Sequence, residues 1–156
     1  MEGIFKSMET SVIEIKVRGF HVDVFGVVNH GRYIQFFEEA RWAYFDERVA
    51  LRDGLHFAGI AHSVVSLEVE YKHPARLGNV LRIETQVSQA GRHSITFSQK
   101  AAISPSSETA VKARVTNVFF QSHGGELIDV DNAVFNYWPD LNEVIRMQSV
   151  DQSVFS

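Results

Sequence analysis

The spacing of apolar residues changes twice along the chain, and each change predicts a different element. From residue 11 to 20 apolar and polar side chains alternate, with Ile13, Ile15 and Val17 on one side, as expected of a half-buried strand. From about Gly31 to Ala50 the apolar residues recur at helical spacing instead, without proline or an interior glycine. Apolar residues flank both sides of this stripe, so we expect one long helix that is buried around most of its circumference.

Four more strand-like segments follow the helix. In the first, residues 62–74, one row of side chains is apolar and the other polar; the apolar row is Val65, Leu67, Val69 and Tyr71. The next three segments are residues 80–89, 93–103 and 109–121, separated by the turn-forming sequences AGR and SPSSE. A short helix opened by Pro139 and Asp140 is expected near the end of the chain.

A strand, a long helix and then four successive strands predict an α+β fold with an antiparallel sheet. Curling that sheet around one long central helix would bury both, which is the arrangement called a hotdog fold. We expect one such domain over residues 11–148, with a loose leader at 1–10 and a frayed tail at 149–156. An open sheet leaves an edge strand, and dimerisation across that edge would cover it.

The amino-acid composition argues against several classes of function. The chain has 156 residues, a net charge of -4 and no cysteine, which argues against general nucleic-acid binding and excludes disulfides and thiolate chemistry. No apolar run is long enough to span a bilayer and no signal peptide is evident, so a cytoplasmic protein without a membrane partner is expected.

The loop before the long helix, FHVDVFGVVNHGRY, gathers the residues best suited to chemistry. Asp23 precedes Gly26, where the chain can reverse sharply, and Asn29 is a suitable N-cap for a helix that starts near His30 or Gly31. The free N–H groups of a helix start can stabilise an oxyanion while a nearby carboxylate attacks or activates water. Gly31 would let a substrate approach the backbone closely.

Simpler readings compete with this one. Asp and Asn before a helix are most often turn and cap residues. His21, Asp23 and His30 could in principle bind a metal, but their spacing matches no metal motif, and we expect no metal.

The run DVFGVVNHGRYIQFFEEAR resembles the signature of hotdog acyl-CoA thioesterases of the 4-hydroxybenzoyl-CoA thioesterase type. It is most similar to the bacterial long-chain acyl-CoA thioesterase III branch, and VEYKHPARLGNVL resembles that family's second strand and turn. The resemblance extends from about Ile13 to Phe120. It implies a thioester hydrolase that acts on acyl-CoA, assembled as a homodimer or homotetramer (a dimer of dimers) with sites between subunits.

The resemblance also assigns roles to individual residues. Asp23 matches the catalytic aspartate, a nucleophile or general base, and the backbone N–H of His30 matches the donor to the thioester carbonyl. Asn29 and Tyr33 match positions at the substrate. Glu38 and Arg41 match the family's E-x-A-R pair; where the third branch usually reads VNN, this chain reads VNH. Further candidates for substrate contact are Val64 and Val65, and weak candidates for coenzyme A contact are Arg92 and Ser94.

The leading hypothesis is hydrolysis of a medium- to long-chain fatty acyl-CoA without a cofactor, since coenzyme A is part of the substrate. Alternatives are an aromatic acyl-CoA thioesterase, an enoyl-thioester hydratase and a non-catalytic acyl-CoA-binding module. Phe36, Phe37, Trp42 and Phe57 could fill the core or line an acyl tunnel.

Overall fold

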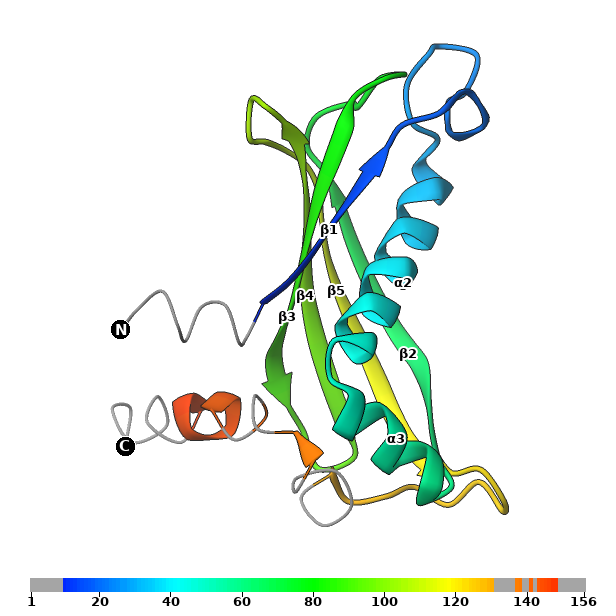
Figure 1. Cartoon of the computed structure of the whole chain (residues 1–156), viewed down its shortest axis with the longest axis vertical. Helices are drawn as coiled ribbons and strands as arrows, with labels where there is room; N and C mark the ends of the chain where they lie inside the picture. Colours follow the sequence, from blue (N-terminus) through cyan, green and yellow to red (C-terminus); the bar gives the residue numbers. More distant parts are fainter. Residues whose placement is uncertain (1–9, 131–136, 139–140, 142, 149–156) are drawn as a thin grey trace.

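The computed structural model describes residues 10–130, 137–138, 141 and 143–148. Five antiparallel strands form one curved sheet, and a long helix, α2, lies across one of its faces (Figure 1). In space the strands follow the order β1-β3-β4-β5-β2, so β1 and β2 are the two edges. This confirms the predicted α+β fold with an antiparallel sheet. The strands are β1 Thr10–Lys16, β2 Ile60–Tyr71, β3 Val80–Ala90, β4 Ser94–Ser104 and β5 Glu108–Gln121.

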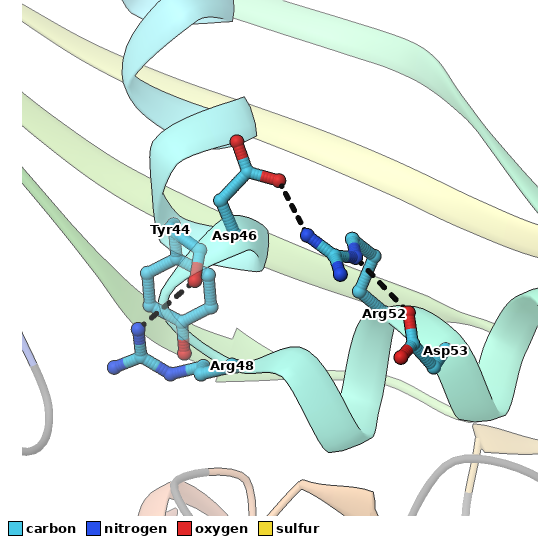
Figure 2. Close-up of polar contacts among 5 residues, drawn as sticks. All are labelled: Tyr44, Asp46, Arg48, Arg52 and Asp53. Atoms are coloured by element: carbon cyan, nitrogen blue, oxygen red, sulfur yellow. Dashed lines mark hydrogen bonds and ion pairs between the residues drawn. The ribbon is translucent and has the colours of Figure 1, made fainter.

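The predicted helix of residues 31–50 is wrong at its C-terminal end. Helix α2 spans His30–Asp46, and a second helix, α3, spans Val49–Phe57 (Figure 1). The guanidinium of Arg48 lies 3.6 Å from the centre of the Tyr44 ring and donates a 3.1 Å hydrogen bond to the Tyr44 carbonyl (Figure 2). Arg48 therefore satisfies a carbonyl that the end of α2 would leave unpaired, and the chain turns there without glycine or proline.

Helix α3 contains Gly54, which in the sequence looks like a break in the helical pattern. A Cβ atom at this position would lie 2.9 Å from the Tyr137 ring, so only glycine allows α3 to approach that ring. A 3.1 Å ion pair from Arg52 to Asp46 connects α3 to the end of α2, and a second one, also 3.1 Å, joins Arg52 to Asp53 within α3 (Figure 2). The glycine therefore serves close packing, and the helix continues through it.

The predicted alternation of β3 and β4 is confirmed. Their inward side chains are all buried; they are Leu81, Ile83, Thr85, Val87, Ile95, Phe97, Gln99 and Ala101. On β2 the alternation is confirmed from Leu67 to Tyr71, whereas Val65 is the extra residue of a bulge between Val64 and Ser66. The bulge is why a strict two-residue pattern places Val65 on the wrong row.

Helix α2 is buried on one side only. Phe36, Phe37 and Ala40 pack against the sheet, but Ile34 and Trp42 are 41% and 56% exposed. The expectation of burial around most of the helix is thus wrong for a single chain, because the sheet covers only one of its faces.

The C-terminal segment packs through Trp138, which is fully buried and donates a 2.9 Å hydrogen bond to the Tyr44 hydroxyl. Residues 141 and 143–148 are helical, while Pro139 and Asp140, the predicted start of that helix, lie outside the described residues, as do most of the predicted leader and the predicted tail. Within the described ranges no helix is long and apolar enough to cross a membrane.

Candidate active site

Asp23 lies in a tight turn between the 3-10 helix Gly19–His21 and α2. Its carboxylate accepts a 2.9 Å hydrogen bond from the Phe25 N–H, and its carbonyl accepts one of 3.0 Å from Gly26. Gly26 has a φ of 75°, a left-handed conformation that glycine adopts without steric cost. Asp23 is thus a turn residue, as the simpler reading predicts, and its partly exposed carboxylate keeps a second oxygen for other partners.

The start of α2 has the geometry of an anion-binding site. The Asn29 side chain caps the helix by accepting a 2.9 Å hydrogen bond from the Gly31 N–H, so the predicted N-cap is confirmed. The Arg32 N–H donates to the Asn29 carbonyl at 2.9 Å. Within the described part of the chain, the His30 N–H has no acceptor, and His30 is an exposed residue at the positive end of the helix.

Backbone hydrogen bonds fix the loop to the helix start and to the sheet. Val22 and Val28 form an antiparallel bridge, and the Asn29 N–H donates to the His21 carbonyl at 3.0 Å. The Val28 N–H donates to the Ala75 carbonyl at 2.9 Å, which joins the loop to the β2–β3 connection. The turn that holds Asp23 and the first turn of α2 therefore belong to one hydrogen-bonded unit at one end of the sheet (Figure 1).

Two tyrosines, Tyr71 of β2 and Tyr33 of α2, contact the first turn of α2 from the side of the sheet. The Tyr71 hydroxyl donates a 2.9 Å hydrogen bond to the His30 carbonyl, and its ring packs edge-on against Tyr33. Tyr33 is 3% exposed, and burial raises the pKa of its hydroxyl. In a single chain Tyr33 is thus a core residue beneath the helix start.

A hollow of about 430 Å³ opens beside the first turn of α2. Its lining residues are Phe20, His21, Val22, Asn29, Gly31, Arg32 and Gln35. His21 accepts a 2.9 Å hydrogen bond from the Arg18 N–H at Nδ1, and burial, followed by the charges of Arg32 and Arg18, lowers its pKa. A neutral imidazole and a helix N-terminus therefore face this hollow.

A second groove, of about 330 Å³, lies between α2 and the β2–β5 side of the sheet. Its walls combine aromatic and polar side chains: Glu38, Arg41, Trp42, Phe45, His62, Ser63, Val64 and Asn117. Arg41 donates a 3.0 Å hydrogen bond to Gln99, whose amide in turn donates to the Phe37 carbonyl and the Thr85 hydroxyl, both at 2.9 Å. This polar network runs through the core beneath the helix.

The sequence analysis did not assign a role to Gln99 or Asn117. A signal for both was present, because Gln99 follows Ile95 and Phe97, and Asn117 stands between apolar residues, on inward rows of their strands. A polar residue on a buried row needs a partner, and that requirement marks it as a residue of interest.

We expect the free energy of unfolding to fall as the pH drops below the ordinary histidine pKa of 6.5. Burial, and then the charge of Arg41, lower the pKa of His62 in the folded chain. Between that lowered pKa and 6.5 the unfolded chain binds a proton that the folded chain does not, so stability is lost as the pH falls through this window.

Urea unfolding at about pH 7.5 and about pH 5.5 measures this loss. The matched variant is His62→Phe, which keeps a ring stacked on Phe45 and removes the titrating group. It should show a smaller loss, with the remainder due in part to His21, whose pKa is lowered in the same direction. An equal loss in both proteins would contradict the assignment to His62.

The remaining predicted contact residues lie away from the loop. Val64 and Val65 are 44% and 59% exposed at the bulge of β2, and Val64 lines the second groove. Arg92 forms a 2.9 Å ion pair with Asp129, and Ser94 begins β4 beside it. Both residues belong to the hairpin between β3 and β4. Within one chain this hairpin lies at the opposite end of the sheet from the loop before α2 (Figure 1). Among the described residues, no three His, Cys, Asp or Glu side chains cluster as metal ligands would.

Comparison with known proteins agrees with this architecture. The model of the thioesterase-like superfamily matches residues 8–141. The long-chain acyl-CoA thioesterase FadM of Escherichia coli (strain K12) is 35% identical over 105 residues, which cover 67% of this chain and 79% of that protein.

Two solved structures have a similar fold. The probable thioesterase YbaW from Escherichia coli matches with a TM-score of 0.69 and 29% identity, over 81% of this chain and 95% of that chain. The 4-hydroxybenzoyl-CoA thioesterase from Pseudomonas sp. strain CBS-3 matches with a TM-score of 0.73 over 83% of this chain and 99% of that chain. Its identity is 20%, so this second likeness shows the fold alone.

Proposed function

The chain belongs to the thioesterase-like superfamily, and we propose that it hydrolyses a medium- to long-chain fatty acyl-CoA to the free acid and coenzyme A. The resemblance to a relative named as a long-chain acyl-CoA thioesterase supports this substrate class. The observation that carries the proposal is the hydrogen-bonded unit that joins the Asp23 turn to the start of α2. It combines a carboxylate with a free backbone N–H, which are the two groups that acyl transfer requires.

Two mechanisms use these groups. In the first, the Asp23 carboxylate attacks the thioester carbonyl, the C–S bond breaks, coenzyme A leaves as thiolate, and water then cleaves the resulting anhydride. In the second, Asp23 removes a proton from a water molecule as that water attacks the carbonyl, and the C–S bond then breaks with coenzyme A leaving as thiolate. In both, negative charge develops on the carbonyl oxygen, and the His30 N–H at the helix start stabilises it. Gly31 leaves the first turn open to the substrate.

The second groove suits the acyl chain. Trp42, Phe45 and Val64 supply apolar walls along α2, beyond the helix start where the thioester would be bound. Phe36 and Phe37 are buried in the core, so Trp42 is the better candidate for contact with the acyl group. An aromatic acyl group is the second candidate, because the same groove has aromatic walls and polar groups.

The coenzyme A end of the substrate calls for a second copy of the chain. The β3–β4 hairpin, which holds Arg92 and Ser94, is at the opposite end of the sheet from the loop before α2 in one chain (Figure 1), so these residues can contact a substrate bound at that loop only from another subunit. A homodimer, or a dimer of dimers, with sites between subunits would bring them together. Asn29 and Val65 would then contact the substrate from the helix start and the strand edge, with Tyr33 supporting that helix start from the core.

A thiol-release assay over acyl-CoA chain lengths tests the proposed function. We expect kcat/KM to rise from short chains to chains of medium and long length, because each buried methylene adds about 0.8 kcal/mol of binding. Benzoyl-CoA and 4-hydroxybenzoyl-CoA test the aromatic alternative. Binding of acyl-CoA without thiol release would identify a non-catalytic module, and crotonyl-CoA hydration would identify a hydratase.

A further inference from the structure

One of the residues that line the second groove, Asn117, has a buried polar atom without a partner among the described residues. Asn117 is on the inward row of β5 and is 3% exposed, yet its Oδ1 has no hydrogen-bond partner among the described residues. Its Nδ2 is paired with His62 Nδ1 at 3.0 Å, so the side chain is held in place. A buried acceptor left without a donor destabilises the fold, and a bound group able to donate would remove that cost.

His62 adds a donor to the same groove. Its ring is stacked on Phe45, with centroids 5.0 Å apart, and burial together with the charge of Arg41 lowers its pKa, so the neutral ring is favoured near pH 7. Since Nδ1 accepts from the Asn117 amide, the proton of the neutral ring is on Nε2. The side chains of Asn117 and His62 thus offer one acceptor and one donor to the groove.

Arg41 supplies further donors. One of its guanidinium nitrogens donates to Gln99 at 3.0 Å, and within the described residues it forms no ion pair with a carboxylate. A guanidinium has five N–H groups, so several remain for a ligand. Besides the exposed side chains of Glu38 and Ser63, the groove therefore has spare donors on Arg41 and one buried spare acceptor, between apolar walls of Trp42 and Val64.

We propose that this groove binds a hydroxyl group carried near the distal end of the acyl chain, an inference that rests on the proposed function. A hydroxyl donates to Asn117 Oδ1 and accepts from His62 or Arg41, so it satisfies both kinds of group. A carboxylate only accepts and would face the Asn117 oxygen with no proton between them. A plain alkyl chain would leave the Asn117 oxygen unpaired and desolvate Arg41.

The position of Arg41 along α2 determines how far from the thioester the hydroxyl must lie on the acyl chain. Arg41 follows Gly31 by ten residues, which corresponds to roughly 15 Å along the helix axis. A hydroxyl close to the thioester would be too near the helix start to reach the groove. The chemistry therefore fits an ω-hydroxyacyl group of medium length.

The test compares dodecanoyl-CoA with ω-hydroxydodecanoyl-CoA and with 3-hydroxydodecanoyl-CoA. Binding is measured as Kd on the Asp23→Asn variant, in which hydrolysis is slowed, and turnover is measured on the wild-type protein. We expect the ω-hydroxyl to tighten binding about 10-fold, whereas the 3-hydroxyl leaves it unchanged. A groove without the proposed role would give weaker binding of the ω-hydroxy chain, because a hydroxyl is costly to bury in an apolar site.

Two variants and one control locate the effect. Asn117→Leu removes the acceptor, and His62→Phe removes the donor while it keeps the stacked ring; each should abolish the preference for the ω-hydroxy chain. The control is Thr116→Val. Thr116 precedes Asn117 on β5 and faces the other side of the sheet, where its hydroxyl is paired with that of Thr96 on β4, so the preference should persist.

Equal or weaker binding of the ω-hydroxy chain overturns the inference, as does a preference that survives both groove variants. Equal or weaker binding of the ω-hydroxy chain is also the result expected if a side chain of a second copy fills the groove. These outcomes differ from failure of the proposed function, which would appear as absence of thiol release from every acyl-CoA by the wild-type protein, whereas the Kd comparison does not depend on turnover.

Discussion

The substitution Asp23→Asn is expected to lower kcat by at least about 100-fold, in the range that general-base groups supply. An amide neither attacks the thioester nor accepts a proton from water, so both mechanisms fail together. The turn should survive, because the Asn side-chain oxygen can still accept the 2.9 Å hydrogen bond from the Phe25 N–H. Steady-state thiol release gives kcat, and thermal unfolding establishes that the variant is folded.

The matched control is Asp46→Asn, which neutralises an exposed carboxylate at the other end of α2. Asp46 bonds to Arg52 near the end of α2, away from the helix start, so kcat should stay unchanged (Figure 2). Full turnover by folded Asp23→Asn would show that Asp23 is only a turn residue. Single-turnover hydrolysis in oxygen-18 water separates the two mechanisms, since label in the Asp23 side chain requires an anhydride.

The periodic parts of the fold could be predicted because their side-chain pattern is also their burial pattern. On β3 and β4 each inward residue is buried, so alternation alone identifies the strands. Helix α3 was missed because Gly54 reads as a break, although the Tyr137 ring makes glycine necessary there. The end of α2 was missed because no glycine or proline marks it: the side chain of Arg48, four residues after Tyr44, contacts the Tyr44 ring and carbonyl there (Figure 2).

The loop before α2 was read correctly as local structure, because caps and tight turns depend on neighbours in the sequence. Asn29 caps the helix, and Asp23 and Gly26 form the turn. The groove could not be read in the same way. Arg41 and Gln99 are 58 residues apart, and Asn117 and His62 are 55 apart, so only the packing of α2 on the sheet and the pairing of β2 with β5 bring these partners together.

The exposure of side chains at the edge of the sheet could not be predicted from the sequence either. The sequence predicts an apolar row on β2, and a row of that kind is normally buried. In a single chain Leu67 and Tyr71, on the inward row, are 37% and 51% exposed, because none of the described helices and strands covers this edge. The other edge, β1, is shorter and alternates Ile13 and Ile15 with Glu14 and Lys16.

Placing a charge on the uncovered inward row of β2 is therefore expected to abolish assembly. In the proposed homodimer, Leu67→Lys would bury an ammonium group without a partner, at a cost of several kcal/mol. In a single chain the partly exposed position would let the lysine reach water, so the subunit should still fold. Equilibrium sedimentation should show monomers where the wild-type protein forms dimers.

Activity should fall together with assembly, because the proposed coenzyme A contacts of Arg92 and Ser94 come from another subunit. The control is Ser66→Lys, which places the same charge one residue earlier on the outward row, where Ser66 is exposed and paired with Thr116. That variant should remain dimeric and active, since its ammonium group stays in water. A dimeric and active Leu67→Lys protein would show that subunits meet elsewhere. A monomeric wild-type protein with full activity would show that one chain contains the complete site.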